Sequence, residues 1–414
     1  MPRLFRWWGL TTPKGALIGF LPVMLLLASP NRVIPSFVVA AIYVVGAAIL
    51  ARPKAADRPA LLYAGVAAAF MVLMLVRMET LDPLDSAQRA YGLAKGVYFL
   101  GAILPLAVAS VLLISTLDDL RPAAVTFVVM AVAFAVPTLI RFNGDLLGTT
   151  RYATLGNLIA VGSAILFQFW IEPKLRLGAG LALLTLLAVV PTESRQSIVA
   201  IAVVLVATAI YWLMADRIRV SSGPARSFGL QWKLPTALGA LGLAAVGSWA
   251  ALIQISRHIS LGLPIGIANP VECNCIAGRF VLLITNQGGR SKLFESGWAL
   301  FTGHPIIGGG LGSFAGRVSA EYPYPHNLPL EVAGEMGIVG VVVLLVPLVV
   351  GWVRLAMAGI RTGSQGAAAA IMIVLVYAVV ANLSGDLPSA RDFWVFGLVV
   401  LKLGFRNSPP EVQL

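Results

Sequence analysis

His326 is the residue whose type and position best suit chemistry in this sequence. It follows the turn-forming run Tyr322-Pro323-Tyr324-Pro325 and precedes Asn327, and nine residues separate that pair from Gly337-Ile338-Val339-Gly340. Because proline disfavours helix before it and Asn is a preferred N-cap, a helix should begin just after Asn327. A neutral imidazole there, where the helix dipole disfavours the charged form, can take a proton from a hydroxyl. A second capping role or an interfacial hydrogen bond explains His326 equally well.

Arginines form the second group of candidates. Guanidinium groups bind phosphate oxygens through paired hydrogen bonds, and several together can hold a diphosphate. Arg195 stands out because the polar run 191–197 separates two apolar stretches with almost no loop to solvate it. For any of these arginines the alternative is snorkelling to lipid headgroups or pairing with an acid. The candidates at or near helix ends or in the largest loop are Arg89, Arg151, Arg195, Arg279, Arg290 and Arg391.

Metal and thiol chemistry find little support. Cys273 and Cys275 are the only cysteines and have no nearby His or Cys with which to complete a zinc site. A disulfide between them would close a strained small ring, so the bridged and free states both stay open. Asp82 and Asp85 form Asp-x-x-Asp, which is better explained as a solvated turn than as a magnesium site. We therefore expect no metal and no cofactor.

The glycine run 308–312 is a further motif with two interpretations. Its backbone could approach a sugar or phosphate, but it lacks the Gly-Lys-Ser/Thr ending of a phosphate-binding P-loop. A tight turn explains it better.

The composition places these residues in a membrane protein. With 58% hydrophobic and 12% charged residues and a mean hydropathy of +0.88, the chain cannot cover a water-soluble core with an ordinary surface. We expect an all-α polytopic membrane protein of about twelve transmembrane helices, the first of them uncleaved. The apolar runs fall near 15–29, 34–51, 60–77, 97–116, 122–140, 155–171, 175–191, 196–214, 234–256, 337–355, 366–384 and 390–405.

The distribution of positive charge predicts the orientation. With both termini in the cytoplasm, more than half of the 30 Lys and Arg residues fall on the inner side. The net charge of +12 then reflects topology and anionic lipid, and nucleic acid is not expected as a partner. We expect one membrane domain over 1–414, with a large periplasmic loop at 257–325 between spans nine and ten. That loop should contain a helix near 292–302, and shorter outer segments should lie at 78–96 and 141–154.

Three stretches resemble the bacterial O-antigen ligases and their polymerase relatives, in the wider O-antigen ligase/polymerase superfamily. Thr192 to Ser197 is similar to the Ser-Arg segment that begins a transmembrane helix in the family. Gly289 to Phe314 resembles its arginine, helix, proline and glycine-rich run. His326-Asn327, with nine residues before Gly337-x-x-Gly340, is similar to the ligase signature.

The resemblance implies a glycosyltransferase on the periplasmic side of the bacterial inner membrane. It implies an undecaprenyl diphosphate-linked glycan as donor and a sugar hydroxyl of the lipid A core as acceptor. His326 matches the base proposed to activate the acceptor. The residues that the resemblance assigns to the donor diphosphate are Arg195, Arg290, Arg279 and, less specifically, Arg89 and Lys95. Guanidinium groups can stabilise a leaving diphosphate without a metal, and a base at His326 would give inversion at the anomeric carbon.

Two other functions remain open at this stage. An O-antigen polymerase would use the same donor with another acceptor, although the spacing after His326 favours a ligase. A transporter of lipid-linked glycan would need polar groups across the bilayer or repeat-related halves, whereas the candidate residues here gather on one face.

Overall fold

The computed structural model describes residues 10–27, 33–51, 53–80, 82, 84–141, 152–168, 175–189, 194–220, 290–318 and 323–406. Within these ranges the regular structure is entirely helical, and no strand occurs. The expected span at 234–256, the cysteine pair, Arg151, Arg279 and the first part of the expected outer loop lie outside the described residues. The chain divides into two compact units, one formed by 1–126 with 292–414 and the other by 127–291.

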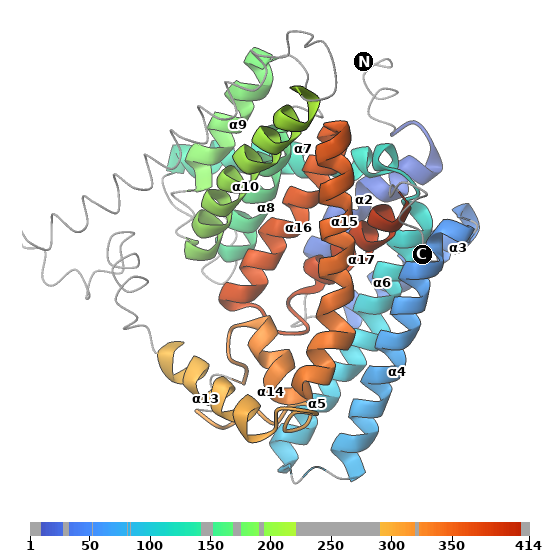
Figure 1. Ribbon diagram of the computed structural model, residues 1–414, viewed down its shortest axis with the longest axis vertical. Coiled ribbons are helices and arrows are strands. Elements are labelled where there is room, and N and C mark those ends of the chain that lie inside the picture. The colour runs from blue at the N-terminus through green and yellow to red at the C-terminus, as the bar shows by residue number, and fades with distance from the viewer. Residues whose placement is uncertain are drawn as a thin grey trace, which may run out of the picture. The chain divides into compact units, whose positions relative to one another are not determined.

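The amino-terminal half of the first unit is a series of apolar helices (Figure 1). The segment from Ser86 to Leu113 is continuous, because a single π-helical turn joins α5 to α6. α7 begins in this unit and crosses its boundary at residue 126. The elements are α2 (Pro13–Leu27), α3 (Val33–Leu50), η1 (Ala55–Asp57), α4 (Arg58–Thr80), α5 (Ser86–Tyr98), η2 (Phe99–Ile103), α6 (Leu104–Leu113) and α7 (Leu117–Arg141).

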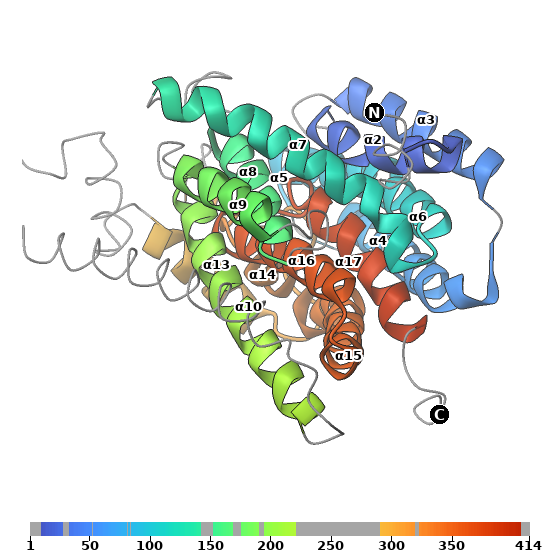
Figure 2. The ribbon, with the colours of Figure 1, turned by 90° about the horizontal axis from the view of Figure 1, so that it is seen from above.

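The carboxy-terminal half of the same unit supplies its central helix. α17 packs against α4, α6, α15 and α16, and Figure 2 shows it lying among them. Every residue from Trp394 to Gly404 is buried, as expected for a helix enclosed by others. The elements are α13 (Arg290–Gly303), α14 (Leu328–Gly340), η5 (Val341–Leu345), α15 (Val346–Thr362), α16 (Gln365–Ser384) and α17 (Arg391–Arg406).

The second unit contains α8 (Tyr152–Leu166), α9 (Leu175–Val189) and α10 (Arg195–Val220). α8 packs against both α9 and α10. A buried amide joins the turn after α8 to α10: Gln168 donates to the Thr208 hydroxyl at 3.0 Å and accepts from the Trp212 indole at 3.0 Å. Such bonds satisfy polar groups that would be costly to leave unpaired in an apolar setting.

The helices identify a multi-pass membrane protein. Among the described residues, six helices are long and apolar enough to cross a bilayer: 55–80, 86–113, 117–139, 196–218, 328–362 and 365–384. Shorter apolar helices occupy 13–27, 34–50, 154–166 and 180–189. Every expected span other than 234–256 therefore coincides with a helix, while the count of twelve and the orientation stay predictions.

The expected outer loop at 78–96 is wrong, because most of it is helical. α4 continues to Thr80 and α5 begins at Ser86. Asp85 caps α5: its carboxylate accepts from the Gln88 backbone N–H at 2.8 Å, and the Gln88 side chain accepts from Asp85 N–H at 3.2 Å. Polar residues that suggested a loop therefore belong to the end of one helix and the start of the next. Two other expectations are confirmed, since α13 covers 292–302 and α14 begins directly after Asn327.

Candidate functional site

His326 occupies a strained backbone position at the start of α14. Its φ of 55° makes it the one non-glycine residue with positive φ in the described part of the chain. That conformation costs about 1–3 kcal/mol and is concentrated at functional sites. The half-buried imidazole lies against the Tyr324 ring, with 4.3 Å between ring centroids.

Asn327 fixes the segment that carries His326. Its side-chain oxygen accepts from the Leu330 backbone N–H at 2.8 Å, which is the N-cap expected from the sequence. Its amide nitrogen donates to the Asn382 carbonyl at 2.8 Å, near the end of α16. One side chain therefore both starts α14 and attaches that start to a second helix.

The glycine at the other end of the motif breaks α14. Gly337 has φ 66° and ψ −167°, a conformation almost restricted to glycine. The break exposes carbonyl groups of the preceding turn, which in a membrane must find partners within the protein. The Gly334 carbonyl accepts from Gly309 N–H at 2.9 Å, and the Glu335 carbonyl accepts from Gly310 N–H at 3.0 Å.

The same segment also satisfies the donors beyond the break. Ile338 N–H donates to the Pro305 carbonyl at 2.8 Å, and Val339 N–H donates to the Ile306 carbonyl at 3.2 Å. The segment 305–310 thus completes the interrupted helix from both sides. Two sequence motifs that looked independent, the glycine run and the second half of the His-Asn signature, are parts of one backbone arrangement.

Close packing explains why this arrangement needs glycine. A Cβ on Gly308 would lie 2.2 Å from the Glu335 carbonyl carbon, and one on Gly337 would lie 2.2 Å from the Ile306 oxygen. A Cβ on Gly310 would lie 2.2 Å from a carboxylate oxygen of Asp82. The turn expected for the glycine run is present, and its glycines permit backbone contact with α14.

The last turn of α4 and its connection to α5 hold the glycine run from the opposite side. Arg77 donates to the Ile307 carbonyl, to the Gly308 carbonyl at 2.9 Å and to Asp82 Oδ1 at 2.9 Å. Asp82 is 5% exposed, so the interpretation of it as a solvated turn is wrong. Burial raises the pKa of Asp82, and the neighbouring Arg77 only partly opposes that rise. Among the described residues, no group of three or more His, Cys, Asp and Glu side chains is arranged as a metal site.

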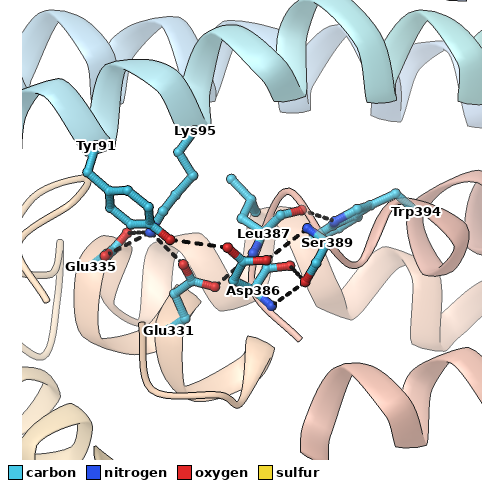
Figure 3. Close-up of polar contacts among 8 residues, drawn as sticks. All are labelled: Tyr91, Lys95, Glu331, Glu335, Asp386, Leu387, Ser389 and Trp394. Atoms are coloured by element: carbon cyan, nitrogen blue, oxygen red, sulfur yellow. Dashed lines mark hydrogen bonds and ion pairs between the residues drawn. The ribbon is translucent and has the colours of Figure 1, made fainter. Parts of the chain in front are cut away.

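A buried ion cluster lies between α5 and α14 (Figure 3). The ammonium group of Lys95 donates to Glu331 Oε1 and to both carboxylate oxygens of Glu335, at 3.0 and 2.8 Å. The other oxygen of Glu331 accepts from Leu387 N–H at 2.8 Å. All three charged side chains are at most 1% exposed. Lys95 is thus a buried residue of a helix rather than a basic residue of an outer loop, and its ammonium group is paired with two carboxylates.

The loop between α16 and α17 borders this cluster. Tyr91 donates to Asp386 Oδ2 at 3.1 Å, and Asp386 Oδ1 accepts from Ser389 N–H at 2.8 Å. The Trp394 indole donates to the Leu387 carbonyl at 3.1 Å (Figure 3). Sequence reasoning missed this network, although two glutamates four residues apart, just before an apolar span, were a signal for it.

Arg89, near the start of α5, has partners at the end of α4 and in the segment that joins the two helices. Its guanidinium group donates to the carbonyls of Leu84, Glu79 and Asp82 at 3.1, 3.3 and 3.3 Å. One nitrogen also lies 3.7 Å from the Glu79 carboxylate. This geometry corresponds to the structural alternative left open by the sequence, in which the arginine pairs with nearby groups of the protein. A diphosphate would have to displace these contacts.

Arg195 and Arg290 are the first residues of α10 and α13, and only their backbone falls within the described structure. A polar network surrounds the start of α10. The Ser197 hydroxyl donates to Asn157 Oδ1 of α8 at 2.7 Å, and the hydroxyls of Ser194 and Ser197 are 2.6 Å apart. The polar run noticed in the sequence is therefore joined to a neighbouring helix.

These features define a multi-pass helical membrane protein in which a histidine precedes a capped half-helix. Residues 180–345 match the family model described as O-Antigen ligase, which confirms the resemblance to the O-antigen ligase/polymerase superfamily. The members of this family are glycosyltransferase-like enzymes of O-antigen and lipopolysaccharide processing. The matched region includes Arg195, Arg290 and His326. A comparison with curated proteins found no match.

Proposed function

We propose that this protein is an O-antigen ligase of the bacterial inner membrane. It transfers O-antigen glycan from undecaprenyl diphosphate to a sugar hydroxyl of the lipid A core at the periplasmic face, with both termini in the cytoplasm. The observation that carries the proposal is the strained, half-buried His326 at the start of α14, inside the region matched by the family model.

In the proposed reaction the His326 imidazole accepts the proton of the acceptor hydroxyl. The hydroxyl oxygen forms a bond to the anomeric carbon of the donor as the bond from that carbon to the diphosphate oxygen breaks. The electron pair of the broken bond leaves with undecaprenyl diphosphate, and attack from the opposite face inverts the anomeric configuration. Arg195, Arg290 and Arg279 bind the diphosphate and stabilise its developing charge, so the reaction needs no metal.

The spacing of the His-Asn motif has a physical meaning that supports this assignment. The nine residues after Asn327 form the half-helix that ends at Gly337. At 1.5 Å per residue they separate the histidine from the break by about 14 Å. The cap and the break together fix where the helix starts, and therefore where His326 can meet an acceptor. This spacing also favours a ligase over a polymerase.

The test is transfer in vitro by purified protein, with undecaprenyl diphosphate glycan, lipid A core and EDTA. Wild type should place glycan on lipid A core, and His326→Ala should lower the rate roughly 10²–10⁴-fold, as expected for loss of a general base. Arg290→Ala should also be impaired. His304→Ala is the matched control, because His304 is an exposed histidine outside the proposed site and should retain activity.

Each alternative function gives a different result in this assay. Glycan chains that grow on the carrier would indicate a polymerase. Movement of labelled carrier lipid without a new glycosidic bond would indicate a transporter. Transfer that is equally fast in wild type, His326→Ala and Arg290→Ala would refute the proposed site.

A further inference from the structure

The helix that carries His326 presents two buried carboxylates to a single lysine. Glu331 and Glu335 are four residues apart and therefore share one face of α14. Lys95 contacts both of them from α5 (Figure 3). Among the described residues, the other ionisable groups facing Glu331 and Lys95 are Asp386 and Tyr91, and neither supplies positive charge.

Lys95 is therefore the cation on which the burial of this face depends. Removing one partner of a buried ion pair leaves an uncompensated charge, which is far costlier than replacing the whole pair by neutral groups. Without Lys95, two carboxylates would stand side by side in a water-poor interior. They would have to take up protons or draw the first half of α14 towards water.

The ion cluster lies near His326 and is bonded to the start of the same helix. Glu331 N–H donates to the Asn327 carbonyl at 2.9 Å in the first turn of the helix. Glu331 lies about 6 Å along the helix axis from Asn327, at 1.5 Å per residue. The start of α14 is thus held by Lys95 on α5, by Leu387 beyond α16 and, through Asn327, by Asn382. Of these three attachments, the lysine contact alone is an ion pair.

We propose that Lys95 is a positioning residue of the transferase: by neutralising Glu331 and Glu335 it holds the half-helix against α5 and so sets the place of His326. This inference rests on the proposed function for its kinetic consequences, but not for its structural ones. Lys95 acts through α14 and does not itself contact donor or acceptor.

The kinetic test compares Lys95→Met with the double variant E331Q/E335Q and with the triple variant that carries all three changes. Lys95→Met should lower kcat at least about tenfold at neutral pH with little change in KM, because the unpaired carboxylates displace the helix. The activity defect of Lys95→Met should shrink as pH falls, because protonation neutralises the two unpaired carboxylates. The activity defect of the double variant should instead shrink as pH rises, because its unpaired lysine then becomes neutral. The triple variant holds no charge at these positions and should recover most of the lost activity, with a pH profile like that of wild type.

A second measurement follows the position of residue 326 without any need for activity. Cys273 and Cys275 are replaced by Ser, His326→Cys supplies a single thiol, and its rate of modification by a membrane-impermeant maleimide is measured. The rate should change several-fold when Lys95→Met is added and return towards the starting value in the triple variant. If Lys95→Met does not fold, the double and triple variants still give the comparison.

Lys402→Met is the matched control, because Lys402 is equally buried and pairs with Asp57 at 2.6 Å but lies on α17. It should lower stability while leaving kcat of the folded protein and the labelling rate unchanged. An unchanged labelling rate in Lys95→Met, or pH trends that run in the same direction for the single and double variants, would overturn the positioning role. Absence of transfer by wild type would refute the proposed function alone, because the labelling result stands by itself.

Discussion

Replacing Gly337 by Ala should break the backbone arrangement that joins the glycine run to α14. The positive φ alone costs about 1–3 kcal/mol for a residue with a Cβ. The added carbon would lie 2.2 Å from the Ile306 oxygen and 2.5 Å from the Ile307 nitrogen, so the backbone must move. Overpacking of this kind costs about 1–3 kcal/mol. Movement would also weaken the bonds donated by Ile338 and Val339, each worth about 1 kcal/mol.

Together these contributions give a loss of roughly 4 kcal/mol, or about a thousandfold in the equilibrium between the intact and the opened arrangement. The assay is thermal unfolding of purified protein in detergent, followed by the loss of monodisperse protein on heating. We expect a midpoint lower by about 5–10 °C, together with loss of glycan transfer.

Two other glycines distinguish backbone strain from close packing as the cause of the destabilisation. Gly316 has φ 79° but no atom within 4 Å of an added Cβ, so Gly316→Ala tests backbone strain alone. Gly303 has open space and no positive φ, and Gly303→Ala should be neutral within about 0.5 kcal/mol. Equal unfolding temperatures for Gly337→Ala and Gly316→Ala would refute a destabilising contribution from the close approach to the 305–310 segment.

Three further changes test separate parts of the structure. Asn327→Ala removes the α14 cap and the bond to Asn382 and should cost about 1–2 kcal/mol in thermal unfolding; a stability equal to wild type would contradict the capping role. Asn157→Leu removes the acceptor of the Ser197 hydroxyl at the start of α10. Because Arg195 is the first residue of this helix, the change should impair glycan transfer, and an unchanged KM for the donor would argue against such a role. Because burial raises the pKa of Asp82, the folded protein retains a proton that the unfolded chain releases, so stability should fall as pH rises from about 4 towards the raised value. Asp82→Asn should flatten this dependence in melting curves between pH 4 and 7, as roughly expected for loss of one titrating carboxyl, and an identical slope would exclude Asp82 as its source.

Local signals in the sequence determined most of the helices and the position of the candidate histidine. Hydropathy located apolar helices because a bilayer demands long runs of apolar residues with internally bonded backbone. Asn327 predicted the start of α14 because capping is a contact over three residues. The order of the short motifs indicated the resemblance to the superfamily, and residues 180–345 match the family model described as O-Antigen ligase.

The α4–α5 region shows where local signals failed. Polar residues between Met78 and Gly96 suggested a loop, because the distant partners of residues such as Lys95 and Tyr91 cannot be read from the local sequence. Lys95 meets Glu331 across 236 positions, and Arg77 meets the Ile307 carbonyl across 230. Composition cannot distinguish a solvated lysine from one enclosed by two glutamates.

The tertiary structure alone decided how the motifs act together. The sequence showed that Gly337 and the glycine run exist, but the pairing of 305–310 with the broken helix depends on which helix faces meet. The same holds for the charge balance around Lys95. Caps and hydropathy act within a few residues, whereas the partners of a buried charge or of an interrupted backbone are chosen by packing, because a buried polar group must be satisfied by whatever the fold brings next to it.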